Sequence, residues 1–160
     1  MVQLSNHSRM IDLLRQVYGE NDDPEQVVIG DEERNKLMAL HPGARTELRN
    51  ENGPYSWILL VPTTSDLMYQ FLNGTINENQ LFHQTEVGIK YDALYLCSAL
   101  ILPEFRRKGL VKNAAINAIS SILEDHSIKY LFYWPFSEEG TKLAESLANK
   151  FNLPLLRKNR

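Results

Sequence analysis

Two apolar runs, each followed by an amphipathic segment, fill the second half of the chain and limit the folds open to it. Residues 94–102 and 128–134 are almost wholly apolar and are predicted to be buried strands. Residues 109–123 and the segment that starts at Ser137 carry apolar side chains at helical spacing. A strand, a helix and a second strand in this order form a parallel crossover. We therefore expect an α/β fold in which the two strands lie side by side.

The first half predicts a hairpin between helical segments. Residues 5–18 and a run after Asp31, which can cap it, have helical spacing. Asn52-Gly53 joins two strand-like stretches, 45–49 and 57–61. Two further helices are expected from Ser65 and from the Thr-x-x-Glu capping box at Thr75. The whole is a mixed central sheet flanked by helices, with a helical insertion before the central strand.

Composition narrows the class of protein. A chain of 160 residues that is 43% hydrophobic and 23% charged fits one globular domain over 1–160. A net charge of −3 argues against a general nucleic-acid or membrane-surface binder. Cys97 is the single cysteine, which fits a reducing compartment, and no apolar run is long enough for a membrane helix. The expected location is the cytoplasm. The four histidines share no metal-ligand spacing, so no metal is expected.

The junction between the first long strand and its helix is the segment richest in basic residues. Four of the 17 Lys and Arg residues fall within 103–112, at the start of a helix, where they oppose the helix dipole. Free backbone N–H groups and Gly109, which has no Cβ, favour an anion such as a pyrophosphate there. The alternative is a solvated basic turn.

This junction resembles the acetyl-CoA loop of the GNAT superfamily of N-acetyltransferases. The family pattern is a hydrophobic strand, Pro-Glu-Tyr/Phe-Arg, then Gln/Arg-x-x-Gly-x-Gly/Ala at the start of a helix. The segment 101–110 reads Ile-Leu-Pro-Glu-Phe-Arg-Arg-Lys-Gly-Leu, so Arg106 and Gly109 occupy family positions, whereas Val111 replaces the last Gly or Ala.

The last helix extends the resemblance, which covers about residues 94–153. Ala144, Leu147 and Lys150 agree with the family's pattern, and Asn152 can adopt the left-handed conformation of the usual glycine. Ala148 stands where the family often has the tyrosine that reprotonates the CoA thiolate. Residues 154–160 are too few for the family's closing hairpin, although 155–156 can form one short strand. This short C-terminus makes a homodimer worth testing.

The resemblance implies transfer of an acetyl group from acetyl-CoA to an amine, carried by a small molecule or a peptide. The implied cofactor-binding residues are Leu100, Ile101, Leu102, Arg106, Arg107, Lys108, Gly109, Leu110, Val111 and Lys112.

Three residues are candidates for acid–base catalysis. Tyr133, at the carboxyl end of the second parallel strand, and Ser137 are candidate proton donors to the thiolate, and Glu86 is a candidate base. Packing in the core is the alternative for Tyr133. Tyr95 and Ser98 are expected on opposite faces of their strand, so that at most one faces the substrate.

Two other functions compete with the enzyme. A non-catalytic acyl-CoA-binding or regulatory domain would keep the loop without the tyrosine. An interaction module would use residues 103–112, the basic loop, to bind an acidic protein. Cys97, inside an apolar strand, is expected to be a small core residue rather than a nucleophile.

Overall fold

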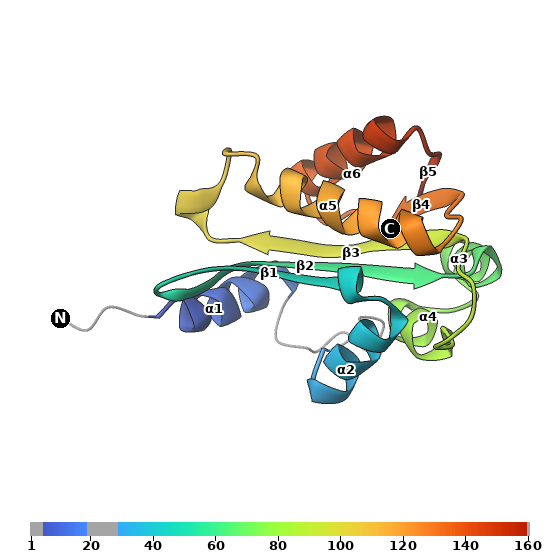
Figure 1. Ribbon diagram of the computed structural model, residues 1–160, viewed down its shortest axis with the longest axis horizontal. Coiled ribbons are helices and arrows are strands. Elements are labelled where there is room, and N and C mark those ends of the chain that lie inside the picture. Colours follow the sequence, from blue (N-terminus) through green and yellow to red (C-terminus); the bar gives the residue numbers. More distant parts are fainter. Residues whose placement is uncertain (1–4, 19–28, 160) are drawn as a thin grey trace.

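One five-stranded sheet organises the computed structural model, which describes residues 5–18 and 29–159 (Figure 1). Its strands are β1 Arg45–Asn50, β2 Gly53–Thr63, β3 Ala93–Ile101, β4 Tyr130–Tyr133 and β5 Leu155–Arg157. The helices are α1 Asn6–Tyr18, α2 Asp31–Leu40, α3 Ser65–Leu72, α4 Glu78–Gln84, α5 Leu110–Asp125 and α6 Glu138–Phe151. Two short 3-10 turns are η1 Pro42–Ala44 and η2 Pro103–Phe105.

The strands follow their chain order across the sheet, β1-β2-β3-β4-β5. β1, β2 and β3 are antiparallel neighbours, whereas β3 with β4 and β4 with β5 are parallel. The predicted mixed α/β sheet and its parallel crossover through α5 are therefore confirmed. The predicted helical insertion, formed by α3 and α4, and the predicted short strand at 155–156, which is β5, are confirmed as well.

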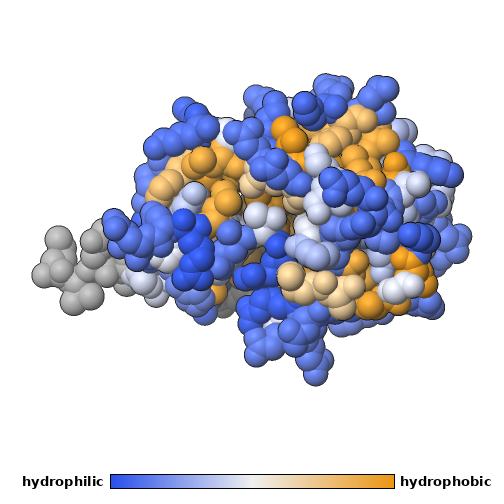
Figure 2. All heavy atoms as spheres, viewed as in Figure 1, coloured by the Kyte–Doolittle hydropathy of each residue, from blue (hydrophilic) through white to orange (hydrophobic). Residues whose placement is uncertain are grey.

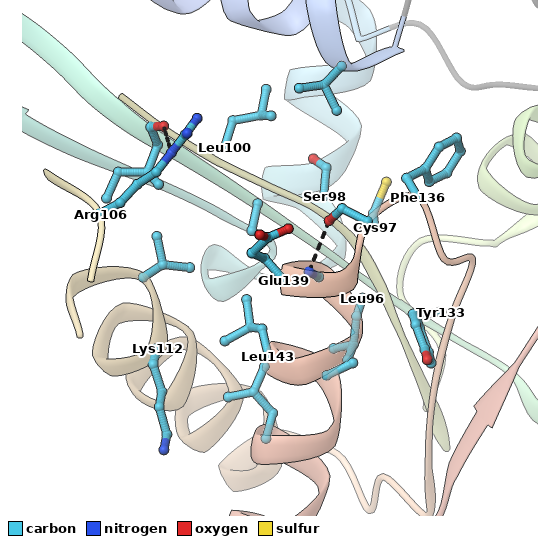
Figure 3. Close-up of a pocket in the computed structure, with 18 of the residues that line it drawn as sticks. Leu96, Cys97, Ser98, Leu100, Arg106, Lys112, Tyr133, Phe136, Glu139 and Leu143 are labelled. Carbon is cyan, nitrogen blue, oxygen red and sulfur yellow. Dashed lines mark hydrogen bonds between the residues drawn. The ribbon is translucent and has the colours of Figure 1, made fainter. Parts of the chain in front are cut away.

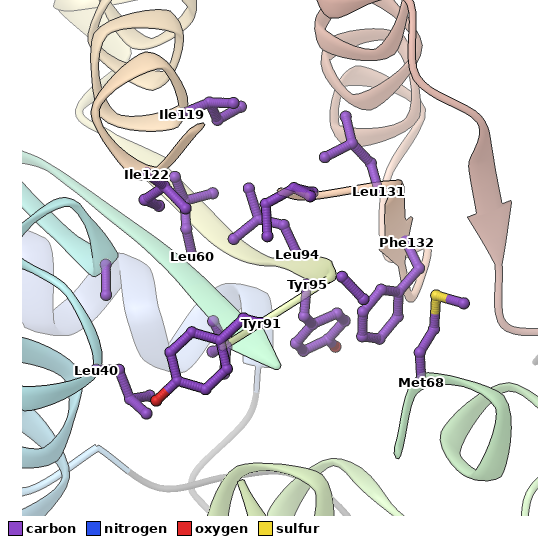
Figure 4. Packing of buried hydrophobic residues seen from close by; sticks show 14 of the residues in the cluster. Leu40, Leu60, Met68, Tyr91, Leu94, Tyr95, Ile119, Ile122, Leu131 and Phe132 are labelled. Atoms are coloured by element: carbon purple, nitrogen blue, oxygen red, sulfur yellow. The ribbon is translucent and has the colours of Figure 1, made fainter. Parts of the chain in front are cut away.

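Helices cover both faces of the sheet. α5 and α6 lie on one face, and α1, α2 and α4 lie on the other (Figure 1). On the α5 face, Leu94 and Leu131 pack with Ile119 and Ile122 in the main core (Figure 4). The opposite face is filled by aromatic rings, among them Tyr95, which is stacked on Phe132 at 5.0 Å between ring centroids. Figure 2 shows a largely hydrophilic surface with apolar residues gathered over α5 and α6.

A β-bulge in β3 reverses one expectation from the sequence. Tyr95 pairs with Val61 and Ser98 pairs with Leu59, so one extra residue lies in β3 between the two pairs. Paired residues on antiparallel strands share a face, and residues two apart on β2 share a face as well. Tyr95 and Ser98 therefore lie on the same face, and the prediction of opposite faces was wrong. The extra residue of a bulge shifts by one position the alternation of side chains between the two faces of the strand.

Local signals placed two helix starts one or two residues away from those observed. The N-cap of α2 is Gly30, whose N–H donates to Glu33 Oε1, and Asp31 is already helical. The capping box of α4 pairs Asn77 with Gln80, and not Thr75 with Glu78. Ser137 caps α6 as expected, and Asn152 ends it in the left-handed conformation with φ 54°. No helix in the described parts of the chain is long and apolar enough to cross a membrane.

Candidate active site

A cavity of about 580 Å³ opens where β3 and β4 separate. β4 pairs with β3 only from Ala93 to Tyr95, while β3 runs on to Ile101 along β2. The cavity is lined by the C-terminal half of β3, the start of α5, the segment after β4 and the first turns of α6 (Figure 3). Its place at the carboxyl ends of two parallel strands is where α/β sheets bind ligands.

The basic loop forms one end of this cavity. Arg106 donates its Nε–H to the carbonyl of Ile101 at 3.2 Å, which ties the loop to the end of β3 (Figure 3). Arg107 and Gly109 both have positive φ, 64° and 74°. A turn of this kind, followed by a helix start, points backbone N–H groups to one side and makes an anion-binding concavity.

The space in front of Gly109 is open. A Cβ built at Gly109 would meet only the Asn113 Nδ2 atom, at 3.7 Å. The first turn of α5 contains no acidic residue and instead carries Lys112, whose positive charge opposes the helix dipole. Both features suit a negatively charged group bound between the loop and α5.

An ion pair fixes the other side of the loop to α1. Both carboxylate oxygens of Glu104 accept from the Arg9 guanidinium, each at 2.6 Å. This contact, chiefly the hydrogen bond, holds the pKa of Glu104 at about 2. The neighbouring Phe105 is stacked on Tyr55 of β2 at 4.2 Å between ring centroids. The turn η2 is therefore held by a salt bridge and a ring pair before the basic residues begin.

The opposite wall is built by β4 and the start of α6. The ring of Tyr133 lines the cavity, and its hydroxyl donates to Thr141 Oγ1 at 3.4 Å. Thr141 lines a second, smaller cavity that shares Ser137 with the main one. Ser137 also lines the main cavity, and its Oγ accepts from the N–H of Gly140 at 3.0 Å. Its own O–H can therefore still donate to a ligand.

The structure brings most of the predicted site residues together. The predicted cofactor residues that line the cavity are Leu100, Ile101, Arg106, Arg107, Gly109, Leu110, Val111 and Lys112, and Tyr133 and Ser137 line it too.

Three of the predicted residues lie elsewhere. Leu102 is buried in a small cluster with Met10 of α1 and Leu100, and Lys108 is exposed and does not line the cavity. Glu86 is exposed in the loop between α4 and β3, before the opposite end of β3, and does not line the cavity.

Sequence reasoning missed several residues of the lining. Glu139 and Leu143 of α6 and Phe136 after β4 all line the cavity (Figure 3). These residues follow the carboxyl end of the second parallel strand in the sequence. That position could have identified them, because the carboxyl ends of both parallel strands meet at the same edge of the sheet. Val17 of α1 lies too far along the sequence for such a rule to identify it.

Cys97, the bulge residue, also lines the cavity and faces a carboxylate. Its Sγ lies 4.0 Å from Oε2 of Glu78, which is on α4. Burial, and then the negative charge of Glu78, raise the pKa of the thiol. The thiol is thus kept protonated, which fits the prediction that Cys97 is not a nucleophile.

Comparison with known proteins gives one structural likeness. No protein-family description matches the chain, and no curated protein matches its sequence. Naa20 of Chaetomium thermophilum, solved in complex with a bisubstrate analogue, is similar over 74% of this chain with 15% identity and a TM-score of 0.40. The matched part is 54% of the Naa20 chain. Among the described residues, no group of three or more His, Cys, Asp or Glu side chains is arranged to hold a metal ion.

Proposed function

We propose that the protein is an acetyl-CoA-dependent N-acetyltransferase, in which an amine attacks the thioester directly. The observation that carries the proposal is the cavity between the separated ends of β3 and β4, with a basic, positive-φ loop at one end. This cavity opens to solvent, and its shape and charge suit a long ligand with a negatively charged end. The loop sequence that resembles the GNAT acetyl-CoA loop forms that end.

The residues present fit the parts of such a ligand. The N–H groups between Arg107 and Val111 would bind the pyrophosphate, and the side chains of Arg107 and Lys112 would add positive charge. The edge of β3 near Leu100 and Ile101, beyond the reach of β4, would bind the amides of the pantetheine arm as a neighbouring strand does. In this arrangement the thioester would lie beside the bulge at Cys97.

The reaction needs one proton removed and one supplied. The amine must be deprotonated before its nitrogen forms a bond to the acetyl carbon, and the carbon–sulfur bond then breaks. The departing sulfur takes a proton. Ser137 is the better placed of the two predicted donors, because its O–H is available to the cavity while the Tyr133 hydroxyl is bound to Thr141.

A non-catalytic acyl-CoA-binding domain is the second candidate. Ala148 is buried and replaces the tyrosine of the resembling family, so the chain lacks that proton donor at that position. Release of free CoA in the presence of primary amines distinguishes the two functions, because a binding domain gives none.

The test of cofactor binding is calorimetric titration with acetyl-CoA. We expect binding in the micromolar range for the wild type. Gly109→Glu places bulk and negative charge against the pyrophosphate and should abolish it. Gly74→Glu is the matched control, because Gly74 also has a positive φ, 85°, and open space around it, but lies between α3 and α4.

Either of two results would overturn the proposal. If the wild-type protein does not bind acetyl-CoA, acetyl-CoA is not its co-substrate. Equal binding by Gly109→Glu and Gly74→Glu shows that the ligand does not use the loop. The left-handed backbone at both sites adds a similar strain of about 1 kcal/mol to each variant, so melting temperatures should match.

A further inference from the structure

The side chain of Ser98 lies in the wall of the cavity next to the bulge in β3 (Figure 3). It follows Cys97, the extra residue of the bulge, and its backbone is paired with Leu59 of β2. The bulge turns Ser98 away from the face on which Leu96 lies and toward the face of Tyr95. A thioester bound beside the bulge would therefore have the Ser98 hydroxyl next to it.

The Ser98 hydroxyl has no hydrogen-bond partner in the part of the chain that the structure describes. The other hydroxyl and thiol groups of the described lining each make a contact. The Tyr133 hydroxyl donates to Thr141, and the Ser137 oxygen accepts from a backbone N–H of α6. The Cys97 sulfur lies 4.0 Å from a carboxylate oxygen of α4. Ser98 is half-buried in the wall, and its hydroxyl has one hydrogen to donate and two lone pairs.

The neighbours of Ser98 in the wall leave it as the one hydroxyl that this part of β3 offers to the cavity. The other lining residues of β3 are Leu96, Cys97, Ala99, Leu100 and Ile101. The basic residues of the lining belong instead to the loop and the first turn of α5. A hydrogen bond among apolar side chains is stronger than the same bond in water, because the local dielectric is low.

The proposed transfer builds negative charge on one oxygen atom. As the amine nitrogen bonds to the acetyl carbon, an electron pair of the C=O bond moves onto the carbonyl oxygen. The carbonyl forms again when the carbon–sulfur bond breaks, and the sulfur leaves with that bonding pair and takes a proton. A donor aimed at the oxygen binds the charged state more strongly than the neutral thioester, and so raises the rate.

We propose that the Ser98 hydroxyl donates a hydrogen bond to the carbonyl oxygen of the bound thioester and is a catalytic residue of the transfer. Ser98 keeps its own proton throughout, and protonation of the sulfur is left to Ser137. This inference rests on the proposed function and adds to it the side chain that stabilises the charge formed on the oxygen.

The test records the carbonyl itself. Acetyl-CoA labelled with carbon-13 at the carbonyl is measured by isotope-edited infrared spectroscopy, free and bound to the protein. A hydrogen bond to the oxygen weakens the C=O bond, so its stretching frequency should fall on binding to the wild type. Ser98→Ala should reverse most of this fall. Ser98→Thr keeps a hydroxyl on a residue that suits a strand and should retain it.

Turnover gives a second readout. Loss of one donor of this kind lowers kcat by about a hundred-fold, so Ser98→Ala should slow CoA release by about that factor. The acceptors are benzylamine, spermidine and a peptide with a free amino terminus. Acetyl-CoA affinity and melting temperature should stay at the wild-type values, whereas a merely structural role would lower both.

Two further variants separate the carbonyl contact from other effects. Ser120→Ala makes the same chemical change at an exposed residue of α5 outside the cavity and should match the wild type in every measurement. Ser137→Ala should slow CoA release but leave the frequency of the bound carbonyl lowered, because its hydroxyl serves the sulfur.

Any of four results overturns the inference. They are a frequency that does not fall on binding to the wild type, a fall that is equal in Ser98→Ala, a fall that is lost in Ser137→Ala instead, or unchanged turnover in Ser98→Ala. A fall that is equal in Ser98→Ala would assign the carbonyl contact to the backbone N–H groups of β3. Failure of the proposed function gives a different result, because acetyl-CoA then does not bind in calorimetry or no amine is acetylated. Bound acetyl-CoA whose carbonyl is unshifted counts against Ser98 alone.

Discussion

Arg9 and Glu104 join the first helix to the loop that starts the candidate cofactor site. The two residues are 95 positions apart in sequence, and the guanidinium meets both carboxylate oxygens at 2.6 Å. This two-point contact fixes orientation as well as distance. Because Glu104 lies two residues before Arg106, the position of α1 is coupled to the position of the basic loop.

Stability should depend on this pair in acid. The contact holds the pKa of Glu104 at about 2, below its ordinary value of 4.5. A carboxylate with a depressed pKa in the folded state stabilises the fold above the ordinary value, and this stabilisation is lost as the pH falls towards the folded-state value. Wild type should therefore melt higher than Arg9→Met at pH 6, and the difference should vanish near pH 2.

The comparison is made by thermal melts across that range. Arg15→Met serves as the control, since Arg15 is an exposed residue of α1 whose guanidinium lies 3.9 Å from the Asp12 carboxylate. The pair is partly exposed, so the difference at pH 6 is expected to be small. A difference that is the same at pH 2 and pH 6 would contradict the role of Glu104.

Arg107 should show opposite effects on stability and on binding. Its φ of 64° is a left-handed conformation, which costs a residue with a Cβ about 1 kcal/mol more than glycine. Arg107→Gly should therefore keep the unfolding free energy or raise it slightly, since the relief of strain is offset by the entropy of glycine in the unfolded chain. Acetyl-CoA affinity should fall about ten-fold through the lost charge.

Denaturant unfolding and calorimetry measure these two effects. Arg107→Lys keeps the charge and the strain, and should retain most of the affinity. A marked loss of stability in Arg107→Gly would show that the side chain holds the loop rather than a ligand.

The two predicted proton donors should separate in a turnover assay. Tyr133→Phe removes a hydroxyl bound to Thr141, so it should lower stability by about 1 kcal/mol and leave turnover close to the wild type. Ser137→Ala removes a cap of α6 and should cost about 1 kcal/mol as well. Only Ser137→Ala should reduce CoA release at saturating substrate.

The matched stability losses make each variant the control for the other. If Tyr133→Phe reduces turnover and Ser137→Ala does not, the tyrosine is the donor and its hydroxyl must leave Thr141 during the reaction.

Strong local patterns explain why much of the fold was predictable. The apolar runs of β3 and β4, the Asn52-Gly53 turn and the Ser137 cap each identified an element by short-range chemistry. The basic loop was predictable for the same reason, because its residues are consecutive. Glycine and basic residues at a helix start are visible in the sequence.

The remaining site residues depend on tertiary placement. The bulge at Cys97 has no sequence signature, yet it decides that Ser98 and Tyr95 share a face. Glu78 contacts Cys97 because the inserted helices α3 and α4 fold back on the sheet, and Val17 reaches the cavity through the docking of α1. Glu86 was close to β3 in sequence, but a nine-residue strand separates the ends that the loop and the cavity occupy.

The reactivity of Cys97 provides an independent test of the contact with Glu78. Burial and then the Glu78 charge raise the pKa of the thiol, so iodoacetamide should alkylate it slowly at pH 8 because the thiolate is the reactive form. Glu78→Gln removes the charge while leaving the burial, so the pKa should fall and alkylation should become faster. Mass spectrometry of the single cysteine follows the reaction without interference from other thiols.

Glu124→Gln makes the same chemical change at an exposed residue of α5 outside the cavity, so it is the control and should alkylate at the wild-type rate. The acceleration in Glu78→Gln should shrink as the pH is raised and both proteins become thiolate. An equal rate in wild type and Glu78→Gln at pH 8 would mean that the carboxylate does not act on the thiol. A faster rate that does not depend on pH would indicate local opening instead of a charge effect.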